Sequence, residues 1–502
     1  MGPIKDSWGL EQGGKNSSEF YKVYNNDQLE VAQSSQLGVE LGGSTPLVVS
    51  AIGQADDVAL VSNEIFALQA LLQLSLQYCQ HHHVTLRGDK TKLQVFSDFR
   101  SDMAAYYAKL VSPITMEGKQ VKFAKEVQHV GLTRSPSGNL PHILGRVEAH
   151  RKVLAGLLPV GLALGHNGNP AASLLIHNLY AIPVLFSGLA SLVLKSTEIS
   201  LLDQVMKKTV QRLMKLMKKT PACIVAFLGG QLPATALLHQ RQLVLFGMVS
   251  RLPGSVLHRH GTTILTSARP SATSWFQKIS DLCILYQLPH PLTTLANPPT
   301  KASYNKQIRS KIFDYWESEL RLKAMELTSA PFFKPEFMSL RLPHPLWLAA
   351  GSNPFECRKA VIAARMLSGR YPTDMLQRHW SQNKLGYCLL PACISSQSQG
   401  SLKHLLLHCV ALQETRAKLH NLCSILSVGN STLEAILKAT FSSDDENNIM
   451  QLILDCTTLP EVIKVTQETS SEVQDKLLYL GRTWCYSIHR ERLNQMGLFE
   501  YR

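Results

Sequence analysis

Two adjacent carboxylates, Asp56 and Asp57, lie in a short polar segment between two apolar runs. Residues 47–52 and 58–61 are rich in β-branched side chains, so the whole stretch is typical of a β-hairpin. Two such charges at a hairpin tip repel each other unless a cation is bound, and a divalent metal used for phosphoryl transfer is a common one. The alternative is that Asp-Asp is ordinary turn chemistry. The pair by itself does not decide between the two.

A second group of residues has the spacing of a zinc site. Four residues separate the first two cysteines, ten follow before a histidine, and four more precede the last cysteine. Three thiolates and one imidazole can enclose a zinc ion tetrahedrally. Pro391 would help to turn the first two cysteines toward one point, and His408, one turn from the first histidine, is a competing ligand. The alternative is a set of buried cysteines without metal. The predicted Zn²⁺ ligands are Cys388, Cys393, His404 and Cys409.

The segments around the two aspartates resemble the reverse transcriptases of non-LTR retrotransposons, the jockey-like LINE elements. Residues 54–57 are similar to the family's aromatic-Ala-Asp-Asp hairpin, with Gln54 at the aromatic position. Residues 9–14 resemble the Gly-x-x-Gln-Gly segment that precedes this hairpin, and residues 20–29 resemble the helix after it. A helical apolar pattern covers residues 68–79. The following segments, residues 84–96 and 121–132, resemble the next palm element and the primer-grip region.

This resemblance implies an α+β fold: a partial right-hand polymerase palm with an antiparallel sheet and helices, then a helical thumb and a mainly helical C-terminal region. It implies an RNA-directed DNA polymerase, a nucleotidyltransferase that acts on an RNA template and a DNA primer or target without a small-molecule cofactor. Asp56 would bind catalytic Mg²⁺, Asp57 would support it, and Lys90 would lie near the leaving pyrophosphate. Gln12 and Gly13 would shape the nucleotide and template pocket. Many members also carry a Cys-Cys-His-Cys cluster near the C-terminus, after a segment like residues 364–371.

The same resemblance makes us expect an element that is truncated within the palm and is inactive alone. In the family, a third carboxylate of the metal site comes from a strand before the Gly-x-x-Gln-Gly segment, which here begins at Gly9. Glu11 also stands where the family favours arginine. The alternative function is a non-catalytic nucleic-acid-binding module derived from such an element.

Composition agrees with a polyanionic partner. The chain has 502 residues, 45% of them hydrophobic, and a formal net charge of +14. This length allows several domains with ample core, and the excess of basic residues suits nucleic acid. Ten cysteines spread over so long a chain, with no apolar signal region over residues 1–14, favour an intracellular location in the nucleus or cytoplasm.

A basic stripe is predicted between residues 206 and 219. Apolar residues recur there at helical spacing, and cationic residues recur on the opposite side. Such a stripe can contact a phosphate backbone without sequence preference, or it can be an ordinary solvated face. Its members are Lys208, Arg212, Lys215 and Lys219.

Residues 153–194 contain no Asp, Glu, Lys or Arg, and residues 171–194 are long enough to span a bilayer. A membrane-associated protein is therefore a further alternative, but we expect a pair of buried helices broken near residues 165–170. Turn-rich and composition boundaries predict five regions. They are a partial palm (1–135), a helical thumb-like region (136–252), a linker with helices (253–345), a region with the zinc-knuckle-like cluster (346–425) and a helical tail (426–502).

Overall fold

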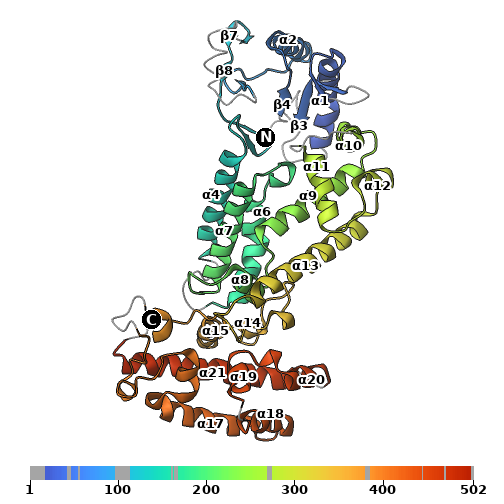
Figure 1. Cartoon of the computed structure of the whole chain (residues 1–502). Helices are drawn as coiled ribbons and strands as arrows, with labels where there is room; N and C mark the ends of the chain where they lie inside the picture. The colour runs from blue at the N-terminus through green and yellow to red at the C-terminus, as the bar shows by residue number, and fades with distance from the viewer. Residues whose placement is uncertain are drawn as a thin grey trace, which may run out of the picture. The chain divides into compact units, whose positions relative to one another are not determined.

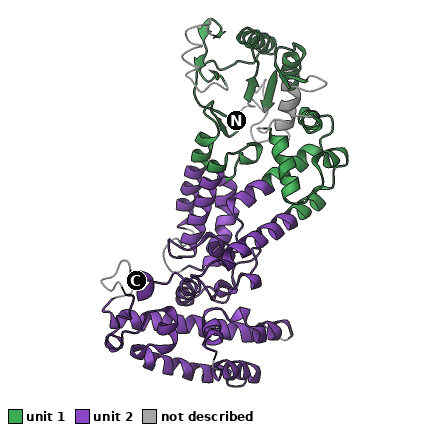
Figure 2. Cartoon of the chain, viewed as in Figure 1, with its two compact units in different colours: residues 1–146, 186–198, 241–308 green, residues 147–185, 199–240, 309–502 purple. Residues whose placement is uncertain are grey.

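The computed structural model describes residues 17–41, 47–54, 57–96, 114–159, 162, 168–267, 274–378, 385–443, 445–468 and 471–498. The chain divides into two compact units, each assembled from separate stretches of sequence (Figure 2). Unit 1 comprises residues 1–146, 186–198 and 241–308, and unit 2 comprises residues 147–185, 199–240 and 309–502. The fold is mixed, with many helices and a few short strand pairs (Figure 1). The five predicted regions stay a prediction.

The strands of the described residues all belong to unit 1 and form five separate two-stranded pairs, of which β5–β8 is parallel and the others are antiparallel. The expected palm sheet therefore remains a prediction. The strands are β1 (Val39–Leu41), β2 (Leu47–Val49), β3 (Ala51–Gln54), β4 (Asp57–Leu60), β5 (Lys92–Leu93), β6 (Thr115–Met116), β7 (Lys119–Gln120), β8 (Lys122–Phe123), β9 (Val127–His129) and β10 (Leu132–Arg134).

The predicted hairpin is present, but its first strand is divided. β3 pairs with β4 so that Gln54 lies opposite Asp57. The run before it breaks at Ser50, which is buried, and β2 pairs with β1 instead of continuing the hairpin. The side chain of Gln33 bonds the chain at this break, because its carbonyl oxygen accepts from the Ser50 amide at 3.2 Å and its NH₂ group donates to the Val48 carbonyl. A run that looks continuous in sequence is therefore divided at Ser50, where a side chain of α1 bonds its backbone.

Helix α2 (Ile65–His81) confirms the helical pattern expected over residues 68–79. Its Leu72 and Leu76 belong to a core cluster with Ile114, Met116 and Val121. The Gln69 side chain joins the helix to the strand region, donating to the Thr115 carbonyl at 3.0 Å and accepting from its amide at 2.9 Å. Unit 1 also contains α1 (Ser17–Ser34), η2 (Leu189–Ser191), α10 (Val256–Thr266), α11 (Trp275–Leu285) and α12 (Pro291–Ala296).

The helices expected over residues 140–252 are present. Four helices contribute residues to both units: α4 (Leu140–Leu157), α7 (Ser196–Leu213), α9 (Ala234–Ser250) and α13 (Lys301–Met325). The charge-free stretch contains the end of α4 and then α5 (Pro170–Ile176), the π-helical turn η1 (His177–Ala181) and α6 (Ile182–Leu185). Leu174 and Leu185 are buried there, whereas Leu175 and Leu179 are exposed.

Within the described residues, no single helix is long and apolar enough to cross a bilayer. Only when taken together are α8 (Ala222–Gly229) and α9 long and apolar enough for a membrane span. The two helices are bent by 62° relative to each other.

The C-terminal part of unit 2 is organised around one long helix, α21 (Glu472–Gln495). α15 (Pro354–Leu367) and α19 (Glu446–Asp455) pack on it. The crossing with α19 is close, because a Cβ at Gly481 would lie 2.4 Å from the Ile453 carbonyl oxygen. Buried Trp484 of α21 donates from its indole to the Leu406 carbonyl at 3.4 Å. α21 thereby fixes the segment that carries the predicted zinc ligands.

Unit 2 holds the remaining helical elements. They are η3 (Pro335–Phe337), α14 (Pro345–Leu348), α16 (Asp374–Gln377), η4 (Pro391–Cys393), η5 (His404–His408), η6 (Val410–Leu412), α17 (Gln413–Ser427), α18 (Ser431–Phe441), η7 (Cys456–Thr458) and α20 (Pro460–Glu468).

Candidate metal centre

The four predicted zinc ligands meet at one point in unit 2. Their ligand atoms all lie within 4.8 Å of one another, and the three cysteines are buried. The Sγ atoms of Cys393 and Cys409 are 3.4 Å apart, and those of Cys388 and Cys409 are 4.0 Å apart. The Cys393 Sγ lies 3.7 Å from Nε2 of His404.

These distances match a tetrahedral zinc ion. With Zn–S bonds of about 2.3 Å and a Zn–N bond of about 2.0 Å, two sulfur ligands lie about 3.8 Å apart, and sulfur and nitrogen about 3.5 Å apart. The three separations given above lie near these values, so the cluster could hold a metal such as zinc.

Backbone hydrogen bonds in two short turns hold Cys388 and Cys393 on the same side of the chain. Tyr387 forms an antiparallel bridge with Gln399, and the Cys388 amide donates to the Ser398 carbonyl at 2.8 Å. Pro391 opens η4, which ends at Cys393, and the Cys393 amide closes this turn onto the Leu390 carbonyl at 2.8 Å. The proline predicted to turn the two cysteines toward one point therefore begins the turn that does so.

The second ligand pair comes from the two ends of one turn. His404 begins η5 and its amide donates to the Ser401 hydroxyl at 3.1 Å. Cys409 directly follows η5, and its amide donates to the His404 carbonyl at 2.7 Å. This is the i→i+5 hydrogen bond of a π-helical turn, and it brings the backbones of His404 and Cys409 close together.

His408, the competing ligand, is directed away from the cluster. Its Nε2 lies 3.1 Å from an Oε1 of Glu446, and nearly half of its side chain is exposed. Lys403 pairs with the other oxygen of the same carboxylate at 2.5 Å. The structure therefore selects His404 as the fourth ligand.

Without a cation, the neighbouring thiols shift each other's pKa values in opposite directions. The hydrogen bond between Cys388 and Cys409 lowers the pKa of the Cys388 thiol and raises that of Cys409, which burial raises further. The two thiols therefore do not ionise together in the metal-free protein, whereas a bound divalent cation favours thiolate at every cysteine ligand.

The surroundings of the cluster are fixed by a buried ion pair. The Arg492 guanidinium of α21 lies 3.1 Å from a carboxylate oxygen of Asp374, and both side chains are buried. A Cβ at Gly400 would lie 2.7 Å from the Asp374 Cβ, so only glycine allows the loop between the ligand pairs to pack this closely.

The residues expected to form the polymerase site are only partly described. Gln12, Gly13 and Asp56 lie outside the described residues. Asp57 is exposed at the first position of β4. Lys90 is exposed in a turn whose backbone closes onto the Arg87 carbonyl. The Mg²⁺ site, and the roles of these residues in binding nucleotide and metal, therefore stay predictions.

The basic stripe is shorter on its helix than the sequence suggested. α7 buries Met206, Val210 and Leu213 as expected, and it exposes Lys208 and Arg212 on the other side. The helix ends at Leu213, and Lys215 follows with φ of +54°. Burial lowers the pKa of the half-buried Lys215. Only Lys208 and Arg212 of the four predicted residues therefore share an exposed helical face; Lys219 is exposed beyond the helix.

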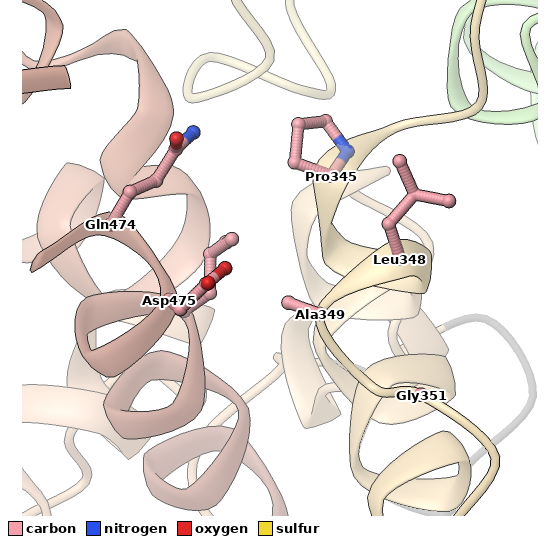
Figure 3. Close-up of a pocket in the computed structure, with 7 residues that line it drawn as sticks. Pro345, Leu348, Ala349, Gly351, Gln474 and Asp475 are labelled. Carbon is pink, nitrogen blue, oxygen red and sulfur yellow. The ribbon is translucent and has the colours of Figure 1, made fainter. Parts of the chain in front are cut away.

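A groove of about 520 Å³ lies between α14 and the start of α21 (Figure 3). Pro345, Leu348 and Ala349 line one side, and Gln474 and Asp475 face them from α21. The lining contains one carboxylate and no histidine, cysteine or serine, so it does not supply a nucleophile with a base.

Comparison of the chain with protein-family models and with curated proteins found no match. The functional argument therefore rests on the metal centre's geometry and on the resemblance of the sequence segments.

Proposed function

We propose that this chain is a nucleic-acid-binding protein related to the reverse transcriptases of non-LTR retrotransposons, and that a structural zinc ion organises its C-terminal region. The observation that carries the zinc proposal is the convergence of Cys388, Cys393, His404 and Cys409 within 4.8 Å. The resemblance of the hairpin segments and the net charge of +14 support the nucleic-acid partner.

The composition of the cluster favours a structural role over a catalytic one. Four protein side chains complete a tetrahedral shell, so no position is left for an activating water. The cysteines are also buried, which keeps substrate away. The zinc would cross-link two hairpin-like turns that contain little other regular structure.

Zinc content tests this proposal directly. We expect the purified protein to bind one zinc ion per chain, measured by elemental analysis, and to melt at a lower temperature after chelation. Cys393→Ser should remove the zinc, whereas Cys423→Ser, at a buried cysteine outside the cluster, should keep it. A wild-type protein that is folded but binds no zinc under reducing conditions contradicts the proposal.

Reverse transcription is a second candidate function, favoured by the β3–β4 hairpin in which Gln54 lies opposite Asp57. Two carboxylates at such a tip could share a divalent cation with an incoming nucleotide. Primer extension on an RNA template with Mg²⁺ tests it. We expect any extension by this protein to disappear in Asp57→Asn, with Asp281→Asn as a control at another exposed aspartate. Extension that survives the hairpin substitution rules out this hairpin as the catalytic site.

A further inference from the structure

Two sulfurs of the candidate metal centre are close enough to form a disulfide after a small movement. The Sγ atoms of Cys393 and Cys409 are 3.4 Å apart, and those of Cys388 and Cys409 are 4.0 Å apart. A disulfide needs about 2.05 Å between its sulfurs. Of these two pairs, Cys393 and Cys409 therefore have the shorter distance to close, and both are free thiols in this structure.

A bond between Cys393 and Cys409 would join the same two segments that a zinc ion joins. Cys388 and Cys393 lie in the segment that the bridge between Tyr387 and Gln399 closes, whereas Cys409 directly follows η5. A disulfide between Cys388 and Cys393 would lie within the first segment alone. The Cys393–Cys409 bond would keep the two segments cross-linked after the metal has left.

The sulfurs lie just beneath the protein surface. Cys393 and Cys409 are buried, but their neighbours in the chain are not, because Ile394 is 62% exposed and Val410 is 60% exposed. Local opening of such short turns admits a molecule as small as hydrogen peroxide. Zinc holds its cysteine ligands as thiolates, and the thiolate is the form of sulfur that a peroxide oxidises.

We propose that Cys393 and Cys409 form a reversible disulfide in exchange for the zinc ion, with a peroxide as the oxidant. This inference rests on the zinc site proposed above. The cluster then acts as a redox-sensitive switch, in which a covalent bond replaces the metal.

The exchange takes place in two steps. One thiolate attacks a peroxide oxygen, the O–O bond breaks, and a sulfenic acid and a hydroxide ion form. The second thiolate attacks the sulfenic sulfur, so that the S–S bond forms and a second hydroxide ion leaves. The two sulfurs lose two electrons, and the peroxide gains them and becomes two water molecules after taking up two protons. Zn²⁺ is released because only Cys388 and His404 remain as ligands.

The test is oxidation of the zinc-loaded, full-length protein by hydrogen peroxide. A chromogenic chelator measures zinc release, and mass spectrometry of a tryptic digest without reductant detects disulfides. Trypsin leaves Cys388 and Cys393 in the peptide 385–403 and Cys409 in the peptide 404–416. We expect loss of the bound zinc together with one cross-link between these peptides, which fragmentation assigns to Cys393. Dithiothreitol and added Zn²⁺ should restore zinc binding.

The matched control is Cys423→Ser, which removes a buried cysteine of α17 that lies outside the cluster. It should release zinc and form the same cross-link as the wild type. Zinc release from the wild type but not from Cys423→Ser would place the sensitive thiol at Cys423 and overturn the proposed exchange.

The other outcomes separate this inference from the zinc proposal. A wild-type protein that binds no zinc under reducing conditions overturns the zinc proposal and the exchange with it. If zinc binds but stays bound during oxidation, or leaves without a bond between Cys393 and Cys409, the exchange is wrong and the zinc site stands.

Discussion

At the scale of single residues, two histidines compete for the fourth ligand position of the candidate metal centre. His404 and His408 lie at the two ends of one turn, and either has the right chemistry to bind zinc. Glu446 holds His408 at the surface, while His404 lies 3.7 Å from the Cys393 sulfur. His404, and not His408, is therefore the imidazole placed to complete the cluster.

This choice predicts opposite results for two similar substitutions. His404→Ala should lose zinc or bind it much more weakly, because three ligands remain. His408→Ala should keep one zinc per chain, because it removes only an exposed ion pair with Glu446, and such pairs contribute little to stability. Elemental analysis and thermal melting of both variants measure this. Zinc lost from His408→Ala and kept in His404→Ala would reverse the assignment.

At the scale of elements, two helical segments of unit 2 are joined by a buried histidine pair. His150 of α4 and His177 of η1 are fully buried, with their Nε2 atoms 3.2 Å apart. Burial lowers the pKa of His150 to about 4 and that of His177 to about 3. Neither imidazole therefore carries a charge at neutral pH, and the pair shares one N–H between two ring nitrogens.

The pair predicts that stability falls in mild acid. Above the unfolded pKa, about 6.5, neither state binds a proton at these rings, so the pair gives no pH dependence. Between about pH 6.5 and pH 4 the unfolded chain binds protons that the folded chain excludes, so the free energy of unfolding decreases as the pH falls. The slope approaches about 1.4 kcal/mol per pH unit for each histidine.

Urea unfolding between pH 7.5 and 4.5 measures this effect. The slope in the double variant His150→Leu, His177→Phe should be flatter than in the wild type. His81→Ala, at an exposed histidine, should leave the slope unchanged. Equal slopes in the wild type and the double variant would exclude the histidine pair as the cause.

At the scale of the whole molecule, the net charge of +14 predicts salt-dependent binding of nucleic acid. Anisotropy of a labelled single-stranded RNA should show affinity that falls steadily with salt. The double reversal Lys208→Glu, Arg212→Glu should weaken binding and reduce the salt slope by roughly one per lost phosphate contact. The matched reversal Lys301→Glu, Lys306→Glu, at exposed positions of α13, should have a smaller effect. Equal effects of both double variants on RNA affinity would show that Lys208 and Arg212 do not form a specific RNA-binding face.

Much of the local structure could be predicted because it depends on neighbours in the sequence. Periodic apolar residues predicted α2 and the buried side of α7, and polar turn residues between β-branched runs predicted the β3–β4 hairpin. The spacing of cysteines and histidine predicted the metal centre, because zinc fixes both the kind and the number of its ligands.

Other features depend on residues that are distant in the sequence but adjacent in space, so no local sequence pattern predicts them. The Gln33 side chain bonds the backbone where the strand breaks at Ser50, and His408 pairs with Glu446. The sequence by itself determined the ligand types and the helical and strand periods, because these follow from covalent spacing. Only the tertiary structure shows which of the two imidazoles lies beside the cysteine sulfurs and where the exposed basic face of α7 ends, because those outcomes depend on distance through space.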